Sequence, residues 1–314
     1  MKNIAFHSNQ LGIRGTEVAL YDYAHFNETI LKNKSFIISD KNNDLEALKK
    51  FEDRFDVFLY DKFEDCFDYI AENNISDIYY QKAGDNDGKI VPNINNLIHA
   101  VFQCNEIHGD KYHYISKWLA RSQNMEDSYV PYIVDMPDPT EDLRLKLNIP
   151  DDKIIIGRHG GINEFDLPFV HKAVYDIVNE REDVVFVFMN TKSFAPKHSN
   201  IIHVGGTYNL QNKSNYINTC DYMLHARHRG ETFGLAISEF LFHDKPVISW
   251  RGGIDQNHIE IIKNEELLYT DYPTLFNILK NIQKNNKPTN YYKKNVNEFT
   301  PENVMKRFNE LFIK

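Results

Sequence analysis

The sequence predicts an α/β protein built from two Rossmann-like domains, each with a parallel β-sheet. Short apolar runs that are typical of buried strands alternate with helical patterns, which is the order of βαβ units. The alternation restarts after Pro137-Asp138-Pro139. The length of 314 residues is too great for one ordinary domain and suits two, each large enough to bury its own core.

In the first half of the chain, the predicted strands are short runs rich in Ile, Phe, Val and Tyr. They cover residues 2–7, 35–39, 55–60, 76–81 and 97–103. Helical patterns at 16–31 and 63–73 separate some of these runs. Because parallel strands need a crossover connection, we expect these helices to cover the faces of the sheet.

The second half repeats this organisation. Its predicted strands cover residues 153–158, 183–189, 201–204, 221–226 and 246–250. Between the halves, a short helix is expected to begin near Thr140, whose hydroxyl and following acidic residues form a plausible cap. We therefore expect an N-terminal domain over residues 1–138, a C-terminal domain over 139–298 and a final helix over 299–314.

Composition predicts a soluble globular protein. Apolar residues make up 42% of the chain and aromatic residues 13%, and no apolar run approaches the roughly 20 residues of a membrane-spanning helix. The formal net charge of −9 gives no electrostatic footprint for nucleic acid, which needs clustered Lys and Arg. Three widely spaced cysteines favour neither a disulfide framework nor a thiolate zinc site.

Residues at the two ends of the sequence indicate where in the cell the protein is expected. The first residues pass directly into a predicted strand without the apolar stretch of a secretory signal, so we expect a cytoplasmic protein. Lysines near the C-terminus are diluted by asparagines. Because a membrane anchor usually has a denser basic face, at most a weak peripheral membrane contact is expected.

The most informative segment contains two glutamates, Glu231 and Glu239, eight positions apart around a Phe-Gly turn. A predicted strand precedes this segment, and the turn opens an apolar helix. The free N–H groups and the dipole of a helix N-terminus favour a diphosphate there. Glu231 is placed to accept hydrogen bonds from sugar hydroxyls, and Glu239 from a ribose diol. Alternatively, both glutamates are solvated residues of a surface helix.

This segment resembles the Glu-x7-Glu signature of retaining glycosyltransferases of the GT-B fold. The sequences Glu-x-Phe-Gly-Leu and Lys245-Pro246-Val247-Ile248 are similar to glycosyltransferase family 4. The resemblance is specific mainly over residues 130–253. It implies two Rossmann-like domains that face each other across a cleft, a C-terminal domain that binds a nucleotide sugar, and an N-terminal domain that binds the acceptor. It also implies that the final helix packs back toward the N-terminal domain.

The diphosphate site that the resemblance implies is only partly present. Arg158 ends a predicted strand and matches the arginine of the family's phosphate clamp, but the lysine expected a few residues later is absent. Either Arg227, Arg229 or His159 supplies the missing cation, or the donor phosphate is held less strongly and catalysis is weak. Alternatively, the two arginines are solubilising surface residues. The turn residues complete the expected donor site, namely Thr232, Phe233, Gly234 and Leu235.

A glycine loop follows the first predicted strand. Gly12 and Gly15 allow the backbone to approach a ligand closely before a helix begins. The loop resembles the Gly-rich loop beside the donor in family 4. A dinucleotide site is the alternative, but the three-glycine spacing of its fingerprint is absent.

A histidine over the donor sugar is also implied by the resemblance. His108, in the loop after the strand run 97–103, is the candidate for this role. His7, His99 and His113 compete for it, and each is also a candidate for a purely structural role.

Metal chemistry has weak support in the sequence. Asp85-Asn86-Asp87 has the Asp-x-Asp form of a metal-dependent transferase, but the following glycine favours a turn. His225 and His228 have no evident third ligand for zinc. We therefore expect catalysis without a metal.

The sequence thus predicts a metal-independent glycosyltransferase, retaining by resemblance, that uses a nucleoside diphosphate sugar as substrate and no other cofactor. UDP- or GDP-linked sugars are the expected donors, and a glycan, a lipid-linked sugar or a polysaccharide precursor is the expected acceptor. Two alternatives stay open. One is an epimerase or phosphorylase on the same scaffold, and the other is a non-catalytic relative that binds sugar nucleotides.

Overall fold

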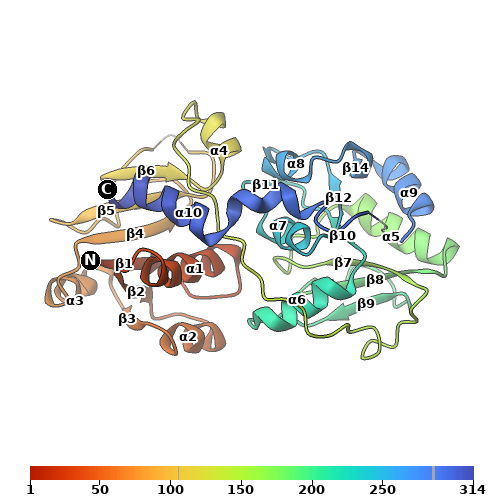
Figure 1. The fold of residues 1–314 in the computed structure, drawn as a ribbon, viewed down its shortest axis with the longest axis horizontal. Coiled ribbons are helices and arrows are strands. Elements are labelled where there is room, and N and C mark those ends of the chain that lie inside the picture. The colour runs from red at the N-terminus through yellow and green to blue at the C-terminus, as the bar shows by residue number, and fades with distance from the viewer. Residues whose placement is uncertain (105, 285–286) are drawn as a thin grey trace. The chain divides into compact units, whose positions relative to one another are not determined.

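The computed structural model describes residues 1–104, 106–284 and 287–314. The chain divides into two compact units, one formed by Met1–Ile133 with Glu298–Lys314 and the other by Val134–Asn297. We call them the N-terminal unit and the C-terminal unit and describe each by itself (Figure 1). Residue 138, where the sequence analysis placed the domain boundary, lies in segment 131–143, which forms neither helix nor strand.

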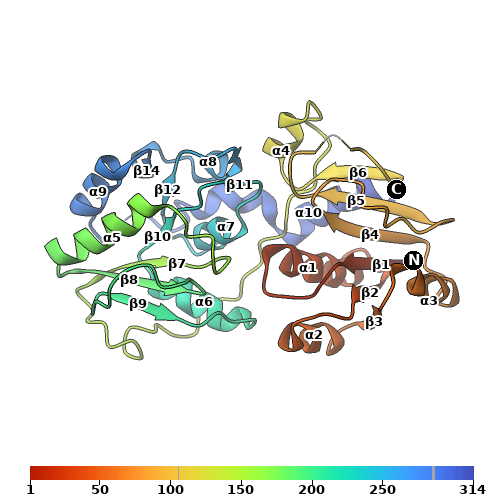
Figure 2. The same ribbon diagram turned by 180° about the vertical axis from the view of Figure 1, so that it is seen from behind.

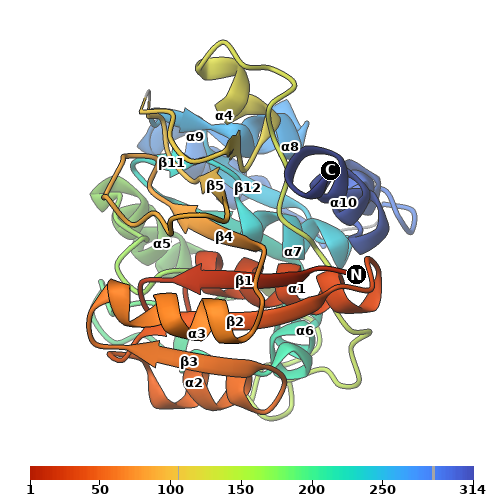
Figure 3. The same cartoon turned by 90° about the vertical axis from the view of Figure 1, so that its left-hand side faces the viewer.

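The N-terminal unit contains a six-stranded sheet in which all neighbouring strands are parallel. Its order across the sheet is β3 (Asp56–Tyr60), β2 (Lys34–Asp40), β1 (Asn3–Ser8), β4 (Asp77–Lys82), β5 (Asn95–Ala100) and β6 (Lys111–Tyr114). Figure 3 shows β1, β2 and β3 side by side. The central strands are buried along most of their length, as expected when helices cover a parallel sheet.

Helices α1, α2 and α3 connect the first four strands in the chain, α4 follows β6, and side-chain caps fix where two of these helices begin. The helices are α1 (Gly15–Thr29), α2 (Leu45–Glu52), α3 (Cys66–Glu72) and α4 (Lys117–Ser122). Asp44 caps α2 by accepting from two backbone amides, and Ser116 caps α4 by accepting from the amide of Leu119. The predicted helices at 16–31 and 63–73 correspond to α1 and to α3 with a preceding 3-10 turn, Phe63–Asp65.

The last residues of the chain complete the N-terminal unit. A 3-10 helix (Lys293–Phe299) leads into α10 (Pro301–Phe308) and a π-helical turn (Asn309–Ile313). Phe308 is fully buried and stacks on Tyr23 of α1, with ring centroids 5.1 Å apart. Phe312 is also fully buried and meets Tyr79 of β4 edge-on at 5.6 Å. The tail therefore contributes to the core of the first unit.

The C-terminal unit contains a second six-stranded parallel sheet. Its order is β14 (Leu268–Tyr269), β12 (Val247–Trp250), β10 (Tyr222–His225), β7 (Ile154–Arg158), β8 (Val184–Met189) and β9 (Ile201–Val204). A separate two-stranded pair joins β11 (Gly230–Glu231) to β13 (Asp255–Gln256). The predicted strands of the second half correspond to β7, β8, β9, β10 and β12.

Helices lie on both faces of this second sheet. They are α5 (Pro168–Glu180), α6 (Leu210–Thr219), α7 (Leu235–Phe242), α8 (Asn257–Ile262) and α9 (Tyr272–Asn281). Helices α5 and α9 pack together in front of the sheet in Figure 2, and α6 and α7 lie behind it. Val170 and Val174 of α5 belong to the same buried apolar cluster as Leu275 and Leu279 of α9. This cluster is the main core of the unit.

One predicted element is wrong. No helix begins near Thr140; residues 144–148 form turns instead. The backbone N–H of Thr140 donates to the side chain of Asn215 on α6, at 2.8 Å, so a distant polar partner holds this segment extended. Within the described residues, no helix has the length and apolar character required to cross a membrane.

Candidate functional site

The predicted donor residues of the C-terminal unit lie at or after the carboxyl ends of β7 and β10. β7 ends at Arg158, and its neighbour β10 ends at His225. From β7 the chain proceeds to β8 and β9 on one side, and from β10 to β12 and β14 on the other. The edge between β7 and β10 is therefore the topological switch point, where open α/β sheets bind their ligands.

Glycines shape the loop that follows β10. Gly230 has φ +80°, and a Cβ there would collide with the backbone carbonyl of Asp255 on β13. Gly234 has φ +94° and stands directly before α7. Both positions need the left-handed conformation that glycine adopts without strain. The loop consequently turns sharply on either side of Glu231.

Glu231 is held between an imidazole and a guanidinium. His225 Nε2 lies 3.2 Å from Glu231 Oε1, and Arg227 Nη1 lies 3.0 Å from Oε2. Burial alone would raise the pKa of Glu231, but the hydrogen bond from His225 and the charge of Arg227 outweigh it and lower the pKa to about 2. Glu231 is therefore ionised at neutral pH. In this form its carboxylate can accept hydrogen bonds but carries no proton to donate.

Glu239, on α7, has partners of the same two kinds. Lys213 Nζ lies 2.7 Å from Oε1, and His159 Nε2 lies 3.0 Å from Oε2. The contact with His159 is at ion-pair distance, but neither of its two atoms is in an aligned hydrogen bond. Burial opposes ionisation of Glu239, yet the charge of Lys213 lowers its pKa to about 2.

Arg158 is a buried cation with neutral partners. Its guanidinium donates to Thr191 Oγ1 at 2.7 Å and to the carbonyl oxygens of Asn190 and Gly161 at 3.2 and 2.9 Å. Burial lowers the pKa of Arg158 to about 10, which still leaves it charged at neutral pH. Among the described residues, it forms no ion pair with a carboxylate. Its charge is therefore free to act on an anion at this edge.

Arg227 and Arg229 differ from Arg158, because carboxylates already neutralise them. Arg227 contacts Glu231 and also Glu164, whose Oε1 lies 2.8 Å from Arg227 Nη2. Arg229 Nε donates to the buried carboxylate of Asp255 at 2.5 Å. Neither arginine lies unpaired on the surface.

The predicted turn residues lie at the start of α7. Thr232 and Phe233 are buried, and the Phe233 carbonyl accepts a hydrogen bond from Asn257 Nδ2 at 2.6 Å. Gly234 is the N-cap residue and has no side chain with which to cap the helix, whose first residue is Leu235. The first-turn amides of α7 thus lie in the same short segment as Glu231.

Solved structures that match this chain over the length of both units place it in a known architecture. Anabaena Alr3699/HepE in complex with UDP-glucose matches with 12% identity and a TM-score of 0.74, covering 99% of each chain. The chain has the GT-B fold. A glycosyltransferase from Rickettsia africae matches at 12% identity and TM-score 0.69, over 100% of this chain and 99% of its own.

Not every GT-B structure that resembles this chain is a glycosyltransferase. A putative UDP-N-acetylglucosamine 2-epimerase from Listeria monocytogenes matches at 13% identity and TM-score 0.61, covering 98% of this chain and 95% of its own. No protein-family model and no curated protein matches the sequence. At these identities the comparisons show the GT-B fold, and the activity must be argued from the site itself.

Four histidines of the N-terminal unit were candidates for the cleft position, and three have structural partners. His7 bonds to Tyr60 Oη at 2.9 Å, and His99 bonds to Tyr79 Oη at 2.6 Å; both are buried. His113 contacts Ser128 Oγ at 2.8 Å.

His108 is the fourth. Its Nδ1 contacts the carbonyl oxygen of Glu106 at 2.7 Å, while its Nε2 has no hydrogen-bond partner among the described residues. The other predicted residues of this unit, Gly12 and Gly15, lie in the loop between β1 and α1 and at the first position of α1. A Cβ at Gly12 would have no neighbour within 4 Å.

Sequence reasoning missed several partners of the two glutamates. Lys213 is 26 positions before Glu239, on a different helix, and His225 was considered only as a metal ligand. The region where the expected lysine is absent supplies Glu164, which binds Arg227. Only the tertiary packing of three elements brings these charges together, and no local motif indicates it.

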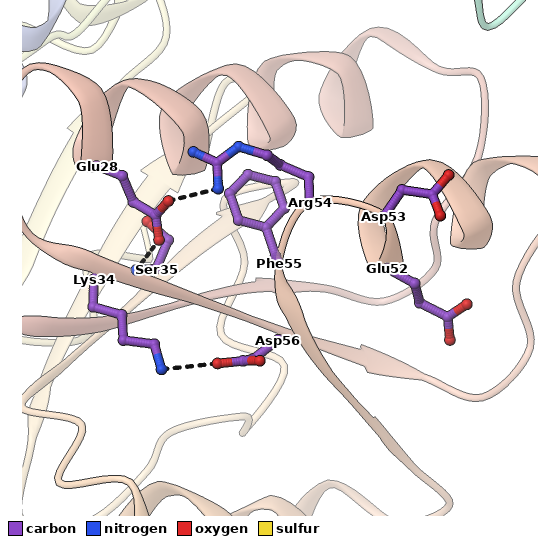
Figure 4. A pocket seen from close by; sticks show the side chains of 8 residues that line it. All are labelled: Glu28, Lys34, Ser35, Glu52, Asp53, Arg54, Phe55 and Asp56. Carbon is purple, nitrogen blue, oxygen red and sulfur yellow. Dashed lines mark hydrogen bonds and ion pairs between the residues drawn. The ribbon is translucent and has the colours of Figure 1, made fainter.

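A hollow in the N-terminal unit does not belong to this site, and the described residues offer no metal site. A surface hollow of about 340 Å³ lies at the amino ends of β2 and β3 (Figure 4). Four of its charged side chains form two ion pairs, Arg54 with Glu28 and Lys34 with Asp56. Among the described residues, no cluster of three or more His, Cys, Asp or Glu side chains is arranged to hold a metal ion.

Proposed function

We propose that this chain is a glycosyltransferase that moves a sugar from a nucleoside diphosphate sugar to an acceptor hydroxyl. One observation carries the proposal: two ionised glutamates, the partly exposed Glu231 just before α7 and the buried Glu239 within it, lie beside the switch point of a GT-B sheet. Such carboxylates accept hydrogen bonds from hydroxyl groups, and the helix N-terminus between them favours a diphosphate.

In this proposal the donor lies along the carboxyl edge of β7 and β10. Glu231 accepts hydrogen bonds from the sugar and offsets positive charge that develops at its anomeric carbon. Arg158 and the amides of Phe233, Gly234 and Leu235 stabilise the negative charge on the leaving diphosphate. Arg227, Arg229 and Thr232 complete the donor site by holding the loop. Glu239 binds the ribose.

Further parts of the proposal rest on the family resemblance. The reaction retains the anomeric configuration and needs no metal, because cationic side chains and helix amides stabilise the diphosphate. The N-terminal unit binds the acceptor, a glycan or a lipid-linked precursor, with His108 and the loop of Gly12 and Gly15 near the reacting groups. The protein acts in the cytoplasm. The preferred donor is a UDP-linked sugar, since the Anabaena structures of this fold contain UDP or UDP-glucose.

Thermal stabilisation by nucleotides tests the donor assignment. A ligand that binds only the native state increases the free energy of unfolding, by about 2.7 kcal/mol at a concentration 100 times its Kd. The unfolding midpoint temperature rises as a result. We expect UDP and UDP-sugars to raise the midpoint of the wild type and to do so much less in Glu239→Ala. An acceptor screen with the stabilising donor, with and without EDTA, then tests transfer and its independence of metal. If no nucleotide or nucleotide sugar binds, the proposal is wrong.

A second candidate function is epimerisation of a UDP-sugar, because a putative epimerase shares the fold over nearly the whole chain. The two functions differ in their need for an acceptor. Incubation of the protein with UDP-N-acetylglucosamine alone, followed by NMR of the sugar, separates them. Appearance of an epimerised nucleotide sugar without acceptor identifies an epimerase. An unchanged donor that is consumed only when an acceptor is added identifies a transferase.

A further inference from the structure

We infer that Lys213 is a positioning residue that makes the donor site select ribonucleotides over 2′-deoxyribonucleotides. The inference rests on the proposed function, in which Glu239 binds the ribose. It narrows the donor class to sugars linked to ribonucleoside diphosphates such as UDP and GDP, and it excludes dTDP-linked sugars.

Lys213 is a nearly buried cation whose partner is the ribose-binding carboxylate. Its Nζ lies 2.7 Å from Glu239 Oε1, and the side chains of Lys213 and Glu239 are only 12% and 4% exposed. A surface ion pair would be screened by water, but this one is not. Lys213 therefore determines where the Oε1 atom of Glu239 is held.

The helix that carries Lys213 is itself fixed to the sheet. Tyr216, one turn further along α6, donates to the carbonyl oxygen of Val187 on β8 at 2.6 Å. It also accepts from the backbone N–H of Arg158 at the end of β7, at 2.8 Å. Ser214 donates to the carbonyl oxygen of Pro137 at 2.7 Å. Because α6 is held at several points, its lysine approaches Glu239 from a defined direction.

The second oxygen of Glu239 is enclosed next to His159, and in this inference the ribose hydroxyls take the place of that imidazole contact. Oε2 is buried and has no aligned hydrogen bond among the described residues, although His159 Nε2 lies 3.0 Å away. With Oε1 held by Lys213, the carboxylate plane is set and the remaining lone pairs face a fixed direction. A vicinal diol donates two hydrogen bonds to such a carboxylate, whereas 2′-deoxyribose donates one.

The loss of one hydrogen bond to a charged acceptor corresponds to about 10- to 100-fold in affinity. That preference requires an oriented carboxylate. Without the cation, Glu239 is free to rotate or to bind a proton, and it then no longer distinguishes one hydroxyl from two. Lys213 thus acts on the ribose through Glu239.

Binding of UDP and 2′-deoxy-UDP, measured by isothermal titration calorimetry, tests this role without any need for an acceptor. We expect the wild type to prefer UDP by about 10- to 100-fold. The preference should fall to within roughly threefold in Lys213→Met and return largely in Lys213→Arg, which keeps the charge. Lys172→Met is the matched control, because Lys172 forms an exposed ion pair with Asp176 on α5; it should keep the wild-type preference.

Each outcome decides the question. If Lys213→Met weakens both nucleotides equally and keeps their ratio, Lys213 is merely structural and the inference is wrong. If the wild type binds both nucleotides equally, the inference is wrong while the proposed function stands. If it binds neither these nor the corresponding guanine nucleotides, the proposed function is wrong as well. Should Lys213→Met not fold, as judged by circular dichroism, Lys213→Gln replaces it.

Discussion

Glu231 and Glu239 have equivalent partners but depend on them to different degrees. Each has an imidazole at one oxygen and a cation at the other. The side chain of Glu231 is 20% exposed, and its cation, Arg227, also binds Glu164. The side chain of Glu239 is 4% exposed, and Glu239 is the one carboxylate that Lys213 contacts among the described residues. The first glutamate belongs to a shared, partly exposed network, whereas the second is buried with one cation, Lys213, and the imidazole of His159.

Because of this difference, we expect substitutions at the two glutamates to have different effects. A partly exposed network tolerates the loss of one member, because the others and water compensate. A buried carboxylate with one cation does not, because removal of the carboxylate leaves that cation buried without a counter-charge. We therefore expect changes at Glu231 to affect mainly the reaction, and changes at Glu239 to affect both folding and nucleotide binding.

The largest expected effect is on catalysis at Glu231. Glu231→Gln should lower the transfer rate by about 10²- to 10³-fold, the magnitude typical of a lost electrostatic contact to the transition state. UDP affinity should change little, because Glu231 is proposed to bind the sugar. Initial rates with the acceptor from the screen and calorimetric Kd values for UDP measure the two effects. Glu180→Gln, on the surface of α5, is the control, and a variant as active as the wild type would remove Glu231 from the site.

The next effect is on stability at Glu239. Glu239→Ala leaves Lys213 buried without its carboxylate, so it should cost about 3 kcal/mol in the free energy of unfolding. Glu231→Ala should cost less, about 1 kcal/mol, because Arg227 keeps Glu164. Urea denaturation at neutral pH measures both. Equal costs would show that the two surroundings do not differ in the way described.

We expect both glutamates to affect the stability of the protein at acidic pH in the same way. Both pKa values are lowered to about 2, so each carboxylate adds stability above its unfolded pKa of 4.5, and this stability is lost as pH falls toward 2. In Glu231→Gln and in Glu239→Gln, the decline of stability between pH 5 and 3 should be less steep than in the wild type. Urea denaturation as a function of pH tests this. An unchanged slope would mean that the replaced carboxylate has a normal pKa.

The smallest effect is expected at Glu164. Its side chain is 44% exposed, and exposed ion pairs contribute about 0–1 kcal/mol. Glu164→Gln should therefore change the free energy of unfolding by less than about 0.5 kcal/mol. In the double variant with Glu231→Ala the cost should exceed the sum of the two single costs, since Arg227 then loses both partners. Simple additivity would show that Arg227 does not share its charge between the two.

The fold was predictable because its signals are local. Alternating strands and helices can be recognised in the sequence from short apolar patterns. The strands predicted in both halves correspond to strands of the two sheets. The prediction of a helix near Thr140 was wrong because the backbone N–H of Thr140 donates to Asn215, which lies 75 positions away in the sequence. A cap motif predicts a helix only when no distant side chain competes for its amide.

The site was predictable only in part. The spacing of Glu231 and Glu239 around a glycine turn identified the segment, because both lie within one strand, loop and helix. The partners of Glu239 could not be identified in this way, since Lys213 comes from α6 and His159 follows β7. The partners of Glu231, His225 and Arg227, lie in its own segment. The sequence also did not indicate that Arg227 and Arg229 would already be paired with carboxylates, which leaves Arg158 as the unpaired cation among the three.

The folded-back tail has a consequence for synthesis of the chain. Phe308 and Phe312 are buried against Tyr23, Tyr79 and His99, so the first unit lacks part of its core until residues 298–314 have left the ribosome. The C-terminal unit, Val134–Asn297, is contiguous and has its full sequence earlier. The unit whose translation begins first is thus completed after the other, and a chain truncated before α10 would expose an aromatic core to chaperones and proteases.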